Sequence, residues 1–207
     1  MPISIGQAAV SRCAGDGVFV ATDVGSTVRL CYPPYSADVA LALGSAVAVA
    51  GGFARTGASS IAVTGDYALL HSGLTPLLDV VSRGLPVVVV VHVNGVQGKT
   101  GGQPVPPVDW PRLLGGLGTV PIQLALTRLS ADALYRSLRD LLSLGRPAVV
   151  MVTEDVAVSG APERTAVGSA GGTAGDCAGA AGPGTASPDD AREPGHVLAT
   201  RRGGARP

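Results

Sequence analysis

The chain is poor in aromatic residues and in cysteine, and it carries no net charge. Phe, Trp and Tyr make up 3% of its 207 residues, so Ala and Val must build the core, as buried parallel strands allow. The three cysteines, Cys13, Cys31 and Cys177, share no C-x-x-C spacing, which argues against a zinc site, an iron–sulfur site or a disulfide framework. Lys and Arg balance Asp and Glu at 15 each, so composition gives no reason to expect nucleic acid or an anionic membrane as a partner.

The sequence also lacks a clear secretory or membrane-spanning segment. Its first residues contain no basic region followed by an apolar core, so no signal peptide is expected. Residues 39–54 are apolar, but they include Gly44, Ser45 and Gly51 and are short for a bilayer, which favours a small-residue helix packed on a sheet. With cysteines suited to a reducing compartment, the sequence predicts a cytoplasmic protein that does not enter a membrane.

Short apolar runs alternate with helical patterns along most of the chain. Strands are predicted at residues 17–22, 61–64, 87–93, 119–125 and 147–153, and helices at 38–55, 75–83, 110–117 and 131–144. Ser36 and Ser130 are the predicted N-caps of the first and last of these helices, and residues 95–107 form a Gly- and Pro-rich loop. Alternating strands and helices predict an α/β fold, an open parallel sheet with helices on both faces in three layers.

The domain prediction follows from a change in composition near residue 158. Residues 1–157 are expected to form one domain. Residues 158–207 are mainly Gly, Ala, Pro, Thr and Asp, and they cannot bury enough apolar surface to offset the entropy of ordering. The sequence therefore predicts a disordered, low-complexity tail, whose basic end is expected to be solvated.

Asp66 and Asn94 are the most informative residues, because each ends an apolar run that reads as a strand. Ligands of open parallel sheets bind beyond the carboxyl ends of the strands, so both side chains are expected at one edge. Mg²⁺ prefers oxygen ligands that it shares with phosphates and water. Asp66 supplies charge, Asn94 a carbonyl oxygen and Val96 a backbone carbonyl. Taken singly, Asp66 and Asn94 are also common turn residues after strands.

Other residues near these strand ends have more than one interpretation. Asp23 either caps a turn or forms a hydrogen bond near a ligand, and His71 either contacts a ligand or bonds to backbone at a helix entry. His92 is expected in the core. Lys99 and Gln103 either contact an anionic substrate or face solvent in a loop.

Gly98-Lys99-Thr100 imitates the end of a P-loop, but the rest of that motif is missing. Val93 stands where the first P-loop glycine is needed. The following Gly- and Pro-rich residues 101–107 also break the helix that must begin at the Lys-Thr pair. Nucleotide hydrolysis is therefore not expected.

The segment from Gly65-Asp66-Tyr67 to Gln103 resembles the thiamine-diphosphate-binding motif, which opens with Gly-Asp and closes with Asn after one helix and one strand. The variant it resembles best is the alpha subunit of indolepyruvate ferredoxin oxidoreductase. The matching segments are His71-Ser72-Gly73-Leu74, similar to His-Thr-Gly-Ile, and Thr100-Gly101-Gly102-Gln103, similar to Thr-Gly-His-Gln. The resemblance covers about residues 15–155.

The sequence departs from that family at three positions. Tyr67 stands where members commonly have Gly, Ser or Ala, and its side chain either crowds the diphosphate or points away. Val93-Asn94 replaces Asn-Asn or Asp-Asn, although the retained Asn is the metal-binding one. Gly102 replaces a histidine, and no cysteine cluster for iron–sulfur centres is present.

The resemblance implies a cofactor site for thiamine diphosphate and Mg²⁺. The residues that carry over or line the same crevice are Gly44, Ser45, Gly65, Asp66, Tyr67, His71, Asn94 and Val96, with Asp66, Asn94 and Val96 as metal ligands. Gly65 allows close approach to the phosphates, and the helix after Asp66 is expected to offer free N–H groups to them.

The family also implies a partner, because the glutamate that activates the cofactor lies in a separate pyrimidine-binding domain. This chain is therefore expected to hold no catalytic residue of its own and to act with a pyrimidine-binding subunit on a small 2-oxo acid. Decarboxylation would give an aldehyde, an acyloin or an acyl product, and the missing cysteine clusters favour decarboxylase or carboligase chemistry over the oxidoreductase. The alternative is a noncatalytic scaffold or regulatory subunit, which Tyr67 favours.

Overall fold

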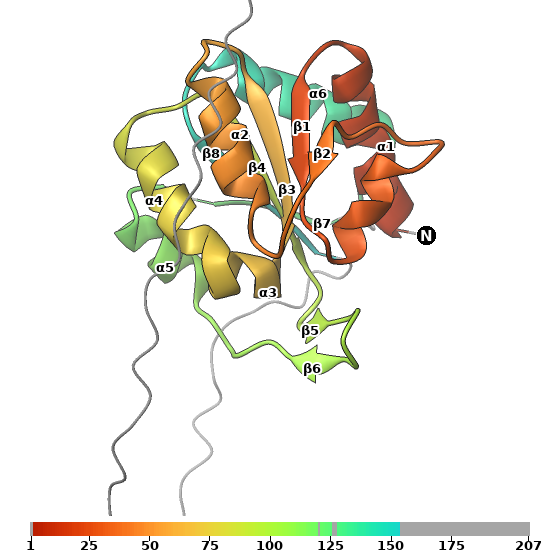
Figure 1. Ribbon diagram of the computed structural model, residues 1–207, viewed down its shortest axis with the longest axis vertical. Coiled ribbons are helices and arrows are strands. Elements are labelled where there is room, and N and C mark those ends of the chain that lie inside the picture. Colours follow the sequence, from red (N-terminus) through yellow and green to blue (C-terminus); the bar gives the residue numbers. More distant parts are fainter. Residues whose placement is uncertain (1, 120, 126–127, 154–207) are drawn as a thin grey trace, which may run out of the picture. The chain divides into compact units, whose positions relative to one another are not determined.

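A computed structural model describes residues 2–119, 121–125 and 128–153, without the side chains of residues 2–5. Within this part of the chain, six strands form one parallel sheet in the order β2-β1-β3-β4-β8-β7 (Figure 1). The strands are β1 (Phe19–Thr22), β2 (Val39–Ala40), β3 (Ser60–Gly65), β4 (Val87–Val93), β7 (Ile122–Ala125) and β8 (Ala148–Thr153). The predicted tail, residues 158–207, lies outside the described residues.

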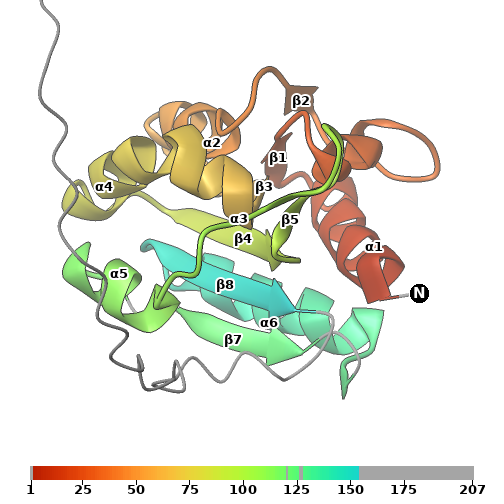
Figure 2. The ribbon, with the colours of Figure 1, turned by 90° about the horizontal axis from the view of Figure 1, so that it is seen from below.

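Helices cover both faces of the sheet, as the sequence predicts. The helical segments are α1 (Pro2–Gly15), the 3-10 turn η1 (Ser26–Cys31), α2 (Ala46–Ala54), α3 (Asp66–Ala68), the π-helical turn η2 (Leu69–Gly73), α4 (Leu74–Ser82), α5 (Trp110–Gly116) and α6 (Ala131–Ser143). Helices α1 and α6 pack on one face, and α2, α4 and α5 on the other (Figure 2). None of the described helices is long and apolar enough to cross a membrane.

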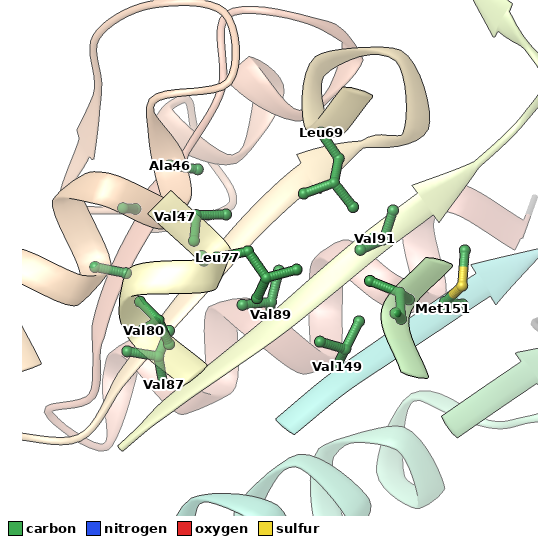
Figure 3. Close-up of a cluster of buried hydrophobic side chains, with 14 of the residues drawn as sticks. Ala46, Val47, Leu69, Leu77, Val80, Val87, Val89, Val91, Val149 and Met151 are labelled. Atoms are coloured by element: carbon green, nitrogen blue, oxygen red, sulfur yellow. The ribbon is translucent and has the colours of Figure 1, made fainter. Parts of the chain in front are cut away.

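The alternation of side chains along β4 divides the core into two apolar layers. Val88 and Val90 face α1 and α6. Val87, Val89 and Val91 face α2, α4 and α5. Figure 3 shows Val87, Val89 and Val91 of β4 beneath the side chains of α2 and α4. Because both faces are covered, β4 is apolar throughout its buried length, which explains the five-valine run in the sequence.

The helix predicted at residues 38–55 begins later, at Ala46, and the prediction of Ser36 as its cap is wrong. Residues 39–40 instead form β2 beside β1, because the Asp38 carboxylate accepts the Val20 N–H at 2.7 Å and holds this segment extended. Ser45 precedes the helix, but its hydroxyl group bonds to Ala42 and does not cap the helix.

Two further helical regions differ from the prediction. Helix α1 was not predicted, because its sequence lacks clear signals for a helix start or end. One face of it is nevertheless buried, through Ala9, Val10 and Cys13. The helix predicted to start at Thr75 belongs to a longer helical stretch that begins at Asp66. In this stretch α3, η2 and α4 follow one another without a break. The π-helical turn between them conceals the helical repeat of the apolar residues.

The remaining predicted strands and helices are confirmed except in their bounds, and one predicted loop contains a hairpin that was not predicted. Ser130 caps α6 by accepting the Ala133 N–H, as expected. The strand predicted to start at residue 119 begins at Ile122. The predicted loop at residues 95–107 contains a short antiparallel hairpin, β5 (Val96–Gln97) and β6 (Gln103–Pro104), which projects below the sheet in Figure 1.

A candidate cofactor site at the carboxyl edge of the sheet

A crevice opens where the chain changes direction within the sheet. From β1 the chain moves outward to β2 and then returns to β3 on the opposite side of β1. Such a switch point leaves a gap beyond the carboxyl ends of the strands, where open α/β sheets bind ligands. The crevice here has a volume of about 410 Å³, part of it open to solvent. Five of the predicted site residues line it: Gly65, Asp66, Tyr67, Asn94 and Val96.

Asp66 links the ends of β3 and β4. Its residue surface is 2% exposed. One carboxylate oxygen accepts the Tyr67 N–H at 2.8 Å, and the other accepts the N–H groups of Asn94 at 3.1 Å and Gly95 at 2.8 Å. An ionised carboxylate has about four acceptor positions. Three of them are used by backbone, which leaves room for one further ligand on the oxygen nearer Tyr67.

Asn94 and Val96 form a turn at the end of β4. The side-chain oxygen of Asn94 accepts the Val96 N–H at 3.1 Å, a local bond that Asn commonly makes in turns. An amide oxygen has two acceptor positions, so one stays available. The turn-forming role and a ligand role are therefore compatible for both Asp66 and Asn94, because each keeps an acceptor position beside the crevice.

Two glycines leave open space along the crevice. A Cβ atom built on Gly65 or on Gly25 would meet no heavy atom within 4 Å. Both residues line the crevice, so a ligand can approach their backbone closely. One N–H at the start of the helical segment is already used, however, because Tyr67, its second residue, donates its N–H to the Asp66 carboxylate.

Gly44, Ser45 and His71 lie outside the lining of the crevice. Gly44 has φ +75°, and a Cβ atom there would lie 2.1 Å from the Ser72 Oγ and 2.7 Å from the Ala68 carbonyl oxygen. The Ser72 hydroxyl also donates to the Leu43 carbonyl at 2.7 Å. This turn therefore packs closely against the helical segment after Asp66 and positions Leu43, which does line the crevice. The predicted contacts of Gly44, Ser45 and His71 with the cofactor stay predictions.

Tyr67 lies half-buried in the crevice wall. Its ring stacks on that of His71, with centroids 6.0 Å apart and an angle of 28° between the ring planes. The exposed His71 also shares a hydrogen bond with the Ser72 hydroxyl at 3.2 Å. The side chain of Tyr67 is thus directed partly toward a neighbour on its own helical segment, and Tyr67 also contributes to the surface that a ligand would meet.

Asp23 caps helix α2 from the end of β1. It is fully buried, and one carboxylate oxygen accepts the Ala46 N–H at 2.9 Å while the other accepts the Thr64 hydroxyl. Burial raises the pKa of Asp23 above the ordinary value of an aspartate, although the hydrogen bonds from Thr64 and from the backbone near Ala46 act in the opposite direction. Asp23 therefore caps a helix and also lines the crevice, and its predicted hydrogen bond near a ligand stays a prediction.

His92 was expected in the core, but it is half-buried at the edge of the crevice. Its side chain lies on the face of β4 that meets α1, and it borders a second, apolar pocket of about 430 Å³, part of it open to solvent. Ser26 and Thr27 of η1 border both spaces as well. Ser26 and Thr27 were not among the predicted site residues, although hydroxyl side chains just after the first strand were a usable signal.

The described residues suit a metal that is shared with a ligand. They contain no group of three or more His, Cys, Asp or Glu side chains able to hold a metal ion alone. Three oxygens are available as ligands. Asp66 and Asn94 each provide one side-chain oxygen with a free acceptor position, and Val96 provides its backbone carbonyl. A hard cation such as Mg²⁺ commonly completes such a set with phosphate oxygens and water. These residues therefore fit Mg²⁺ bound together with a diphosphate.

Comparison with known families places the residues of the crevice within a described domain. A family described as "Thiamine pyrophosphate enzyme, C-terminal TPP binding domain" matches residues 23–151, which include every residue of the crevice. The chain belongs to this family. Thiamine pyrophosphate is thiamine diphosphate, so the predicted fold and thiamine diphosphate as the cofactor are confirmed at the level of the family, whereas Mg²⁺ stays a prediction.

Relatives of this thiamine pyrophosphate-binding domain include larger proteins. The chain is 38% identical over 100 residues to the indolepyruvate oxidoreductase subunit IorA of Methanothermobacter thermautotrophicus, a match that covers 46% of the chain and 16% of that relative. The predicted similarity to this subunit is therefore confirmed. The chain matches less than a fifth of the relative's length, so the relative contains much that the matched region does not.

Solved structures share the fold of this domain. The 2-oxoglutarate:ferredoxin oxidoreductase from Magnetococcus marinus aligns with a TM-score of 0.61 at 17% identity, over 73% of this chain and 60% of the other. The benzoylformate decarboxylase from Polynucleobacter necessarius aligns with a TM-score of 0.54 at 16% identity, over 72% of this chain and 32% of the other. At these identities the likeness shows the three-layer fold alone.

Proposed function

We propose that this chain binds thiamine diphosphate with Mg²⁺ in the crevice and serves as the diphosphate-binding component of a two-component enzyme that acts on a 2-oxo acid. The observation that carries the proposal is the position of Asp66. Its buried carboxylate ties the ends of two central strands together and keeps one acceptor position beside the crevice. Family membership supports the cofactor.

In this proposal the residues of the crevice bind and orient the cofactor. Asp66, Asn94 and the Val96 carbonyl hold Mg²⁺, and the open backbone at Gly65 and Gly25 gives the phosphates room. When bound, thiamine diphosphate supplies a nucleophilic carbon that adds to the 2-oxo group and permits loss of carbon dioxide. The chain's contribution is positioning, since a fixed diphosphate holds the reacting ring beside the substrate.

A partner subunit is proposed because the crevice has exposed apolar residues around it. Val24, Leu41 and Val96 follow β1, β2 and β4 at the carboxyl edge of the sheet, and they are 43%, 64% and 41% exposed. We infer that this edge contacts a pyrimidine-binding subunit, which would also supply the activating glutamate. The Methanothermobacter relative is much longer than the matched region, which is consistent with an enzyme that contains domains besides this one.

The name of the curated relative supports a 2-oxo acid as substrate. Indolepyruvate, which appears in the name of the Methanothermobacter relative, is a 2-oxo acid. The similarity to the indolepyruvate oxidoreductase subunit favours oxidative formation of an acyl product, with two electrons passed to an acceptor on another component, over release of an aldehyde or acyloin. The free thiols of Cys13 and Cys31 suit a reducing compartment, so we place the protein in the cytoplasm.

Reconstitution tests this function. The chain would be combined with a pyrimidine-binding subunit encoded beside it, and release of labelled carbon dioxide would be followed with pyruvate, phenylpyruvate and 2-oxoglutarate. With an artificial electron acceptor in every assay, we expect release from at least one acid only when both proteins, thiamine diphosphate and Mg²⁺ are present. Release that persists without this chain would contradict the proposal.

A noncatalytic role is the second candidate, and the position of Tyr67 favours it. The half-buried phenol occupies part of the crevice wall. If this side chain obstructs the cofactor, Tyr67→Gly should tighten thiamine diphosphate binding sharply, and the natural site would be a weakened one. Unchanged or weaker binding in Tyr67→Gly would remove the support for a scaffold.

A further inference from the structure

We propose that Lys99 is the anion-recognition residue of the crevice, held by the β5–β6 hairpin so that its ammonium group binds a phosphate or carboxylate oxygen of the ligand. The inference rests on the proposed function, because it names the residue that would recognise the charged end of the cofactor or substrate. Lys99 lines the same crevice as Asp66 and Asn94.

The sequence sets Lys99 apart from the other basic residues. It is the single lysine among the fifteen Lys and Arg residues of the chain. A lysine ammonium is a compact charge on a flexible stem, and it suits one oxygen of a phosphate or carboxylate, whereas arginine presents a flat fork of donors. In a chain that otherwise uses arginine, lysine stands at the position that faces the crevice.

The hairpin around Lys99 is braced by its own hydrogen bonds. The Thr100 hydroxyl donates to the side-chain oxygen of Gln103 at 2.8 Å, and the Gln103 amide donates back to the Thr100 carbonyl at 2.6 Å. The Gly102 N–H donates to the Gln97 carbonyl at 3.0 Å across the hairpin. These bonds hold the backbone on both sides of Lys99, so the Lys99 Cα has a fixed position at the crevice wall.

The hairpin also approaches the opposite wall of the crevice. A Cβ atom on Gly98 would lie 3.6 Å from the Ser26 Oγ at the start of η1, which is ordinary contact distance. Gly98 and Ser26 both line the crevice. The segment that carries Lys99 therefore lies close to η1, and its side chain can reach a ligand held at the Asp66 end.

Lys99 is available to bind an anionic ligand, because the two carboxylates of the crevice receive their hydrogen bonds from other groups. The carboxylates of Asp23 and Asp66 are buried and receive their hydrogen bonds from Ala46, Thr64 and the backbone after β3 and β4. Within the described residues, Lys99 forms no ion pair. Mg²⁺ would neutralise only part of the combined negative charge of Asp66 and a diphosphate. A further cation at the crevice wall would therefore stabilise the bound ligand.

The first test is a calorimetric titration with thiamine diphosphate and Mg²⁺, and in parallel with pyrophosphate and Mg²⁺. If Lys99 contacts a phosphate, Lys99→Met should weaken both affinities roughly tenfold, as expected for loss of one charge-assisted hydrogen bond. Lys99→Arg should retain most of the affinity. Arg55→Met is the matched control, because Arg55 is exposed in a separate groove between α2 and α4, and it should change nothing.

The second test distinguishes a phosphate from a carboxylate. Because Lys99 is the only lysine, acetylation of its amine can be followed by mass spectrometry without interference from other lysines. Protection by pyrophosphate with Mg²⁺ would assign the contact to phosphate. Protection of the cofactor-loaded protein by added pyruvate, but not by its uncharged methyl ester, would assign it to the substrate carboxylate.

The outcomes separate this inference from the proposed function. If thiamine diphosphate binds equally to the wild type and to Lys99→Met, and neither pyrophosphate nor pyruvate protects Lys99, the inference is overturned while the cofactor site stands. If thiamine diphosphate does not bind but pyrophosphate binds and protects Lys99, the anion site stands and the proposed cofactor is wrong.

Discussion

One carboxylate, that of Asp66, joins the ends of two neighbouring strands. It accepts three backbone N–H groups, from Tyr67, Asn94 and Gly95, before any ligand is considered. Replacing it with alanine leaves these donors without their partner, and an unsatisfied buried donor costs about 1–3 kcal/mol. Asn94 and Gly95 are exposed enough for water to compensate in part.

We therefore expect Asp66→Ala to lower the free energy of unfolding of the ligand-free protein by about 2 kcal/mol. Urea denaturation without cofactor measures this, with Asp109→Ala as the control. Asp109 caps α5 through the Arg112 N–H on the surface, so its loss should cost about 1 kcal/mol and leave the crevice intact. An Asp66→Ala protein as stable as the wild type would show that the three bonds do not form in solution.

Asp23 gives a second prediction, on pH. The unfolded residue ionises at about pH 3.9, whereas burial raises the pKa of Asp23 in the folded protein. The folded state therefore retains a proton where the unfolded state has lost it. The contribution of Asp23 to stability falls as pH rises through this interval and is lowest above the folded pKa.

Asp23→Asn keeps an acceptor for the Ala46 N–H and removes the buried charge. Urea midpoints measured between about pH 4 and neutrality should decline less with rising pH in Asp23→Asn than in the wild type. The variant should be at least as stable as the wild type at neutral pH. A steeper decline in the variant would contradict the assigned direction of the pKa shift.

At the scale of elements, helices α2 and α4 approach closely at a glycine. A Cβ atom on Gly51 would lie 2.8 Å from the Val80 Cγ2, so in Gly51→Ala either the Val80 side chain or one of the two helices must shift. The adjacent Gly52 is exposed, and a Cβ atom there would meet nothing within 4 Å.

We expect Gly51→Ala to destabilise the protein by about 1–3 kcal/mol through overpacking. Gly52→Ala should stabilise it by up to about 1 kcal/mol through helix propensity. Thermal unfolding of the two variants measures the contrast within one helix. Equal shifts in the same direction would mean that α2 and α4 do not pack as described.

Elements whose signals are local were predictable from sequence. The five-valine strand β4 and the Ser130-capped helix α6 were predicted within one or two residues of their bounds. The start of α2 was not, because residues 38–40 are held by a hydrogen bond from Val20, a contact made only in the folded sheet. The cap of α2 was missed for the same reason, since Asp23 follows β1 and reaches α2 only in the folded domain.

At the scale of the whole domain, the crevice exists because the strands are parallel and successive strands are added on opposite sides of β1. The chain places β2 on one side of β1 and β3 on the other. Asp66 and Asn94 were predicted to meet because parallel strands end at one edge, and the structure brings them together. Ser26, Thr27 and His92 were not predicted as its neighbours, because η1 approaches β4 only through tertiary packing. The family match over residues 23–151 covers this whole arrangement.

The measurement that tests the central claim most directly is calorimetric titration of thiamine diphosphate into the purified chain, with and without Mg²⁺. It would be repeated with Asp66→Asn, in which a neutral amide replaces the carboxylate. The account predicts saturable binding that requires Mg²⁺ and is lost in Asp66→Asn. Binding that is equally tight without Mg²⁺, or unchanged in Asp66→Asn, would contradict the assignment of Asp66 as the residue that holds the metal and the diphosphate.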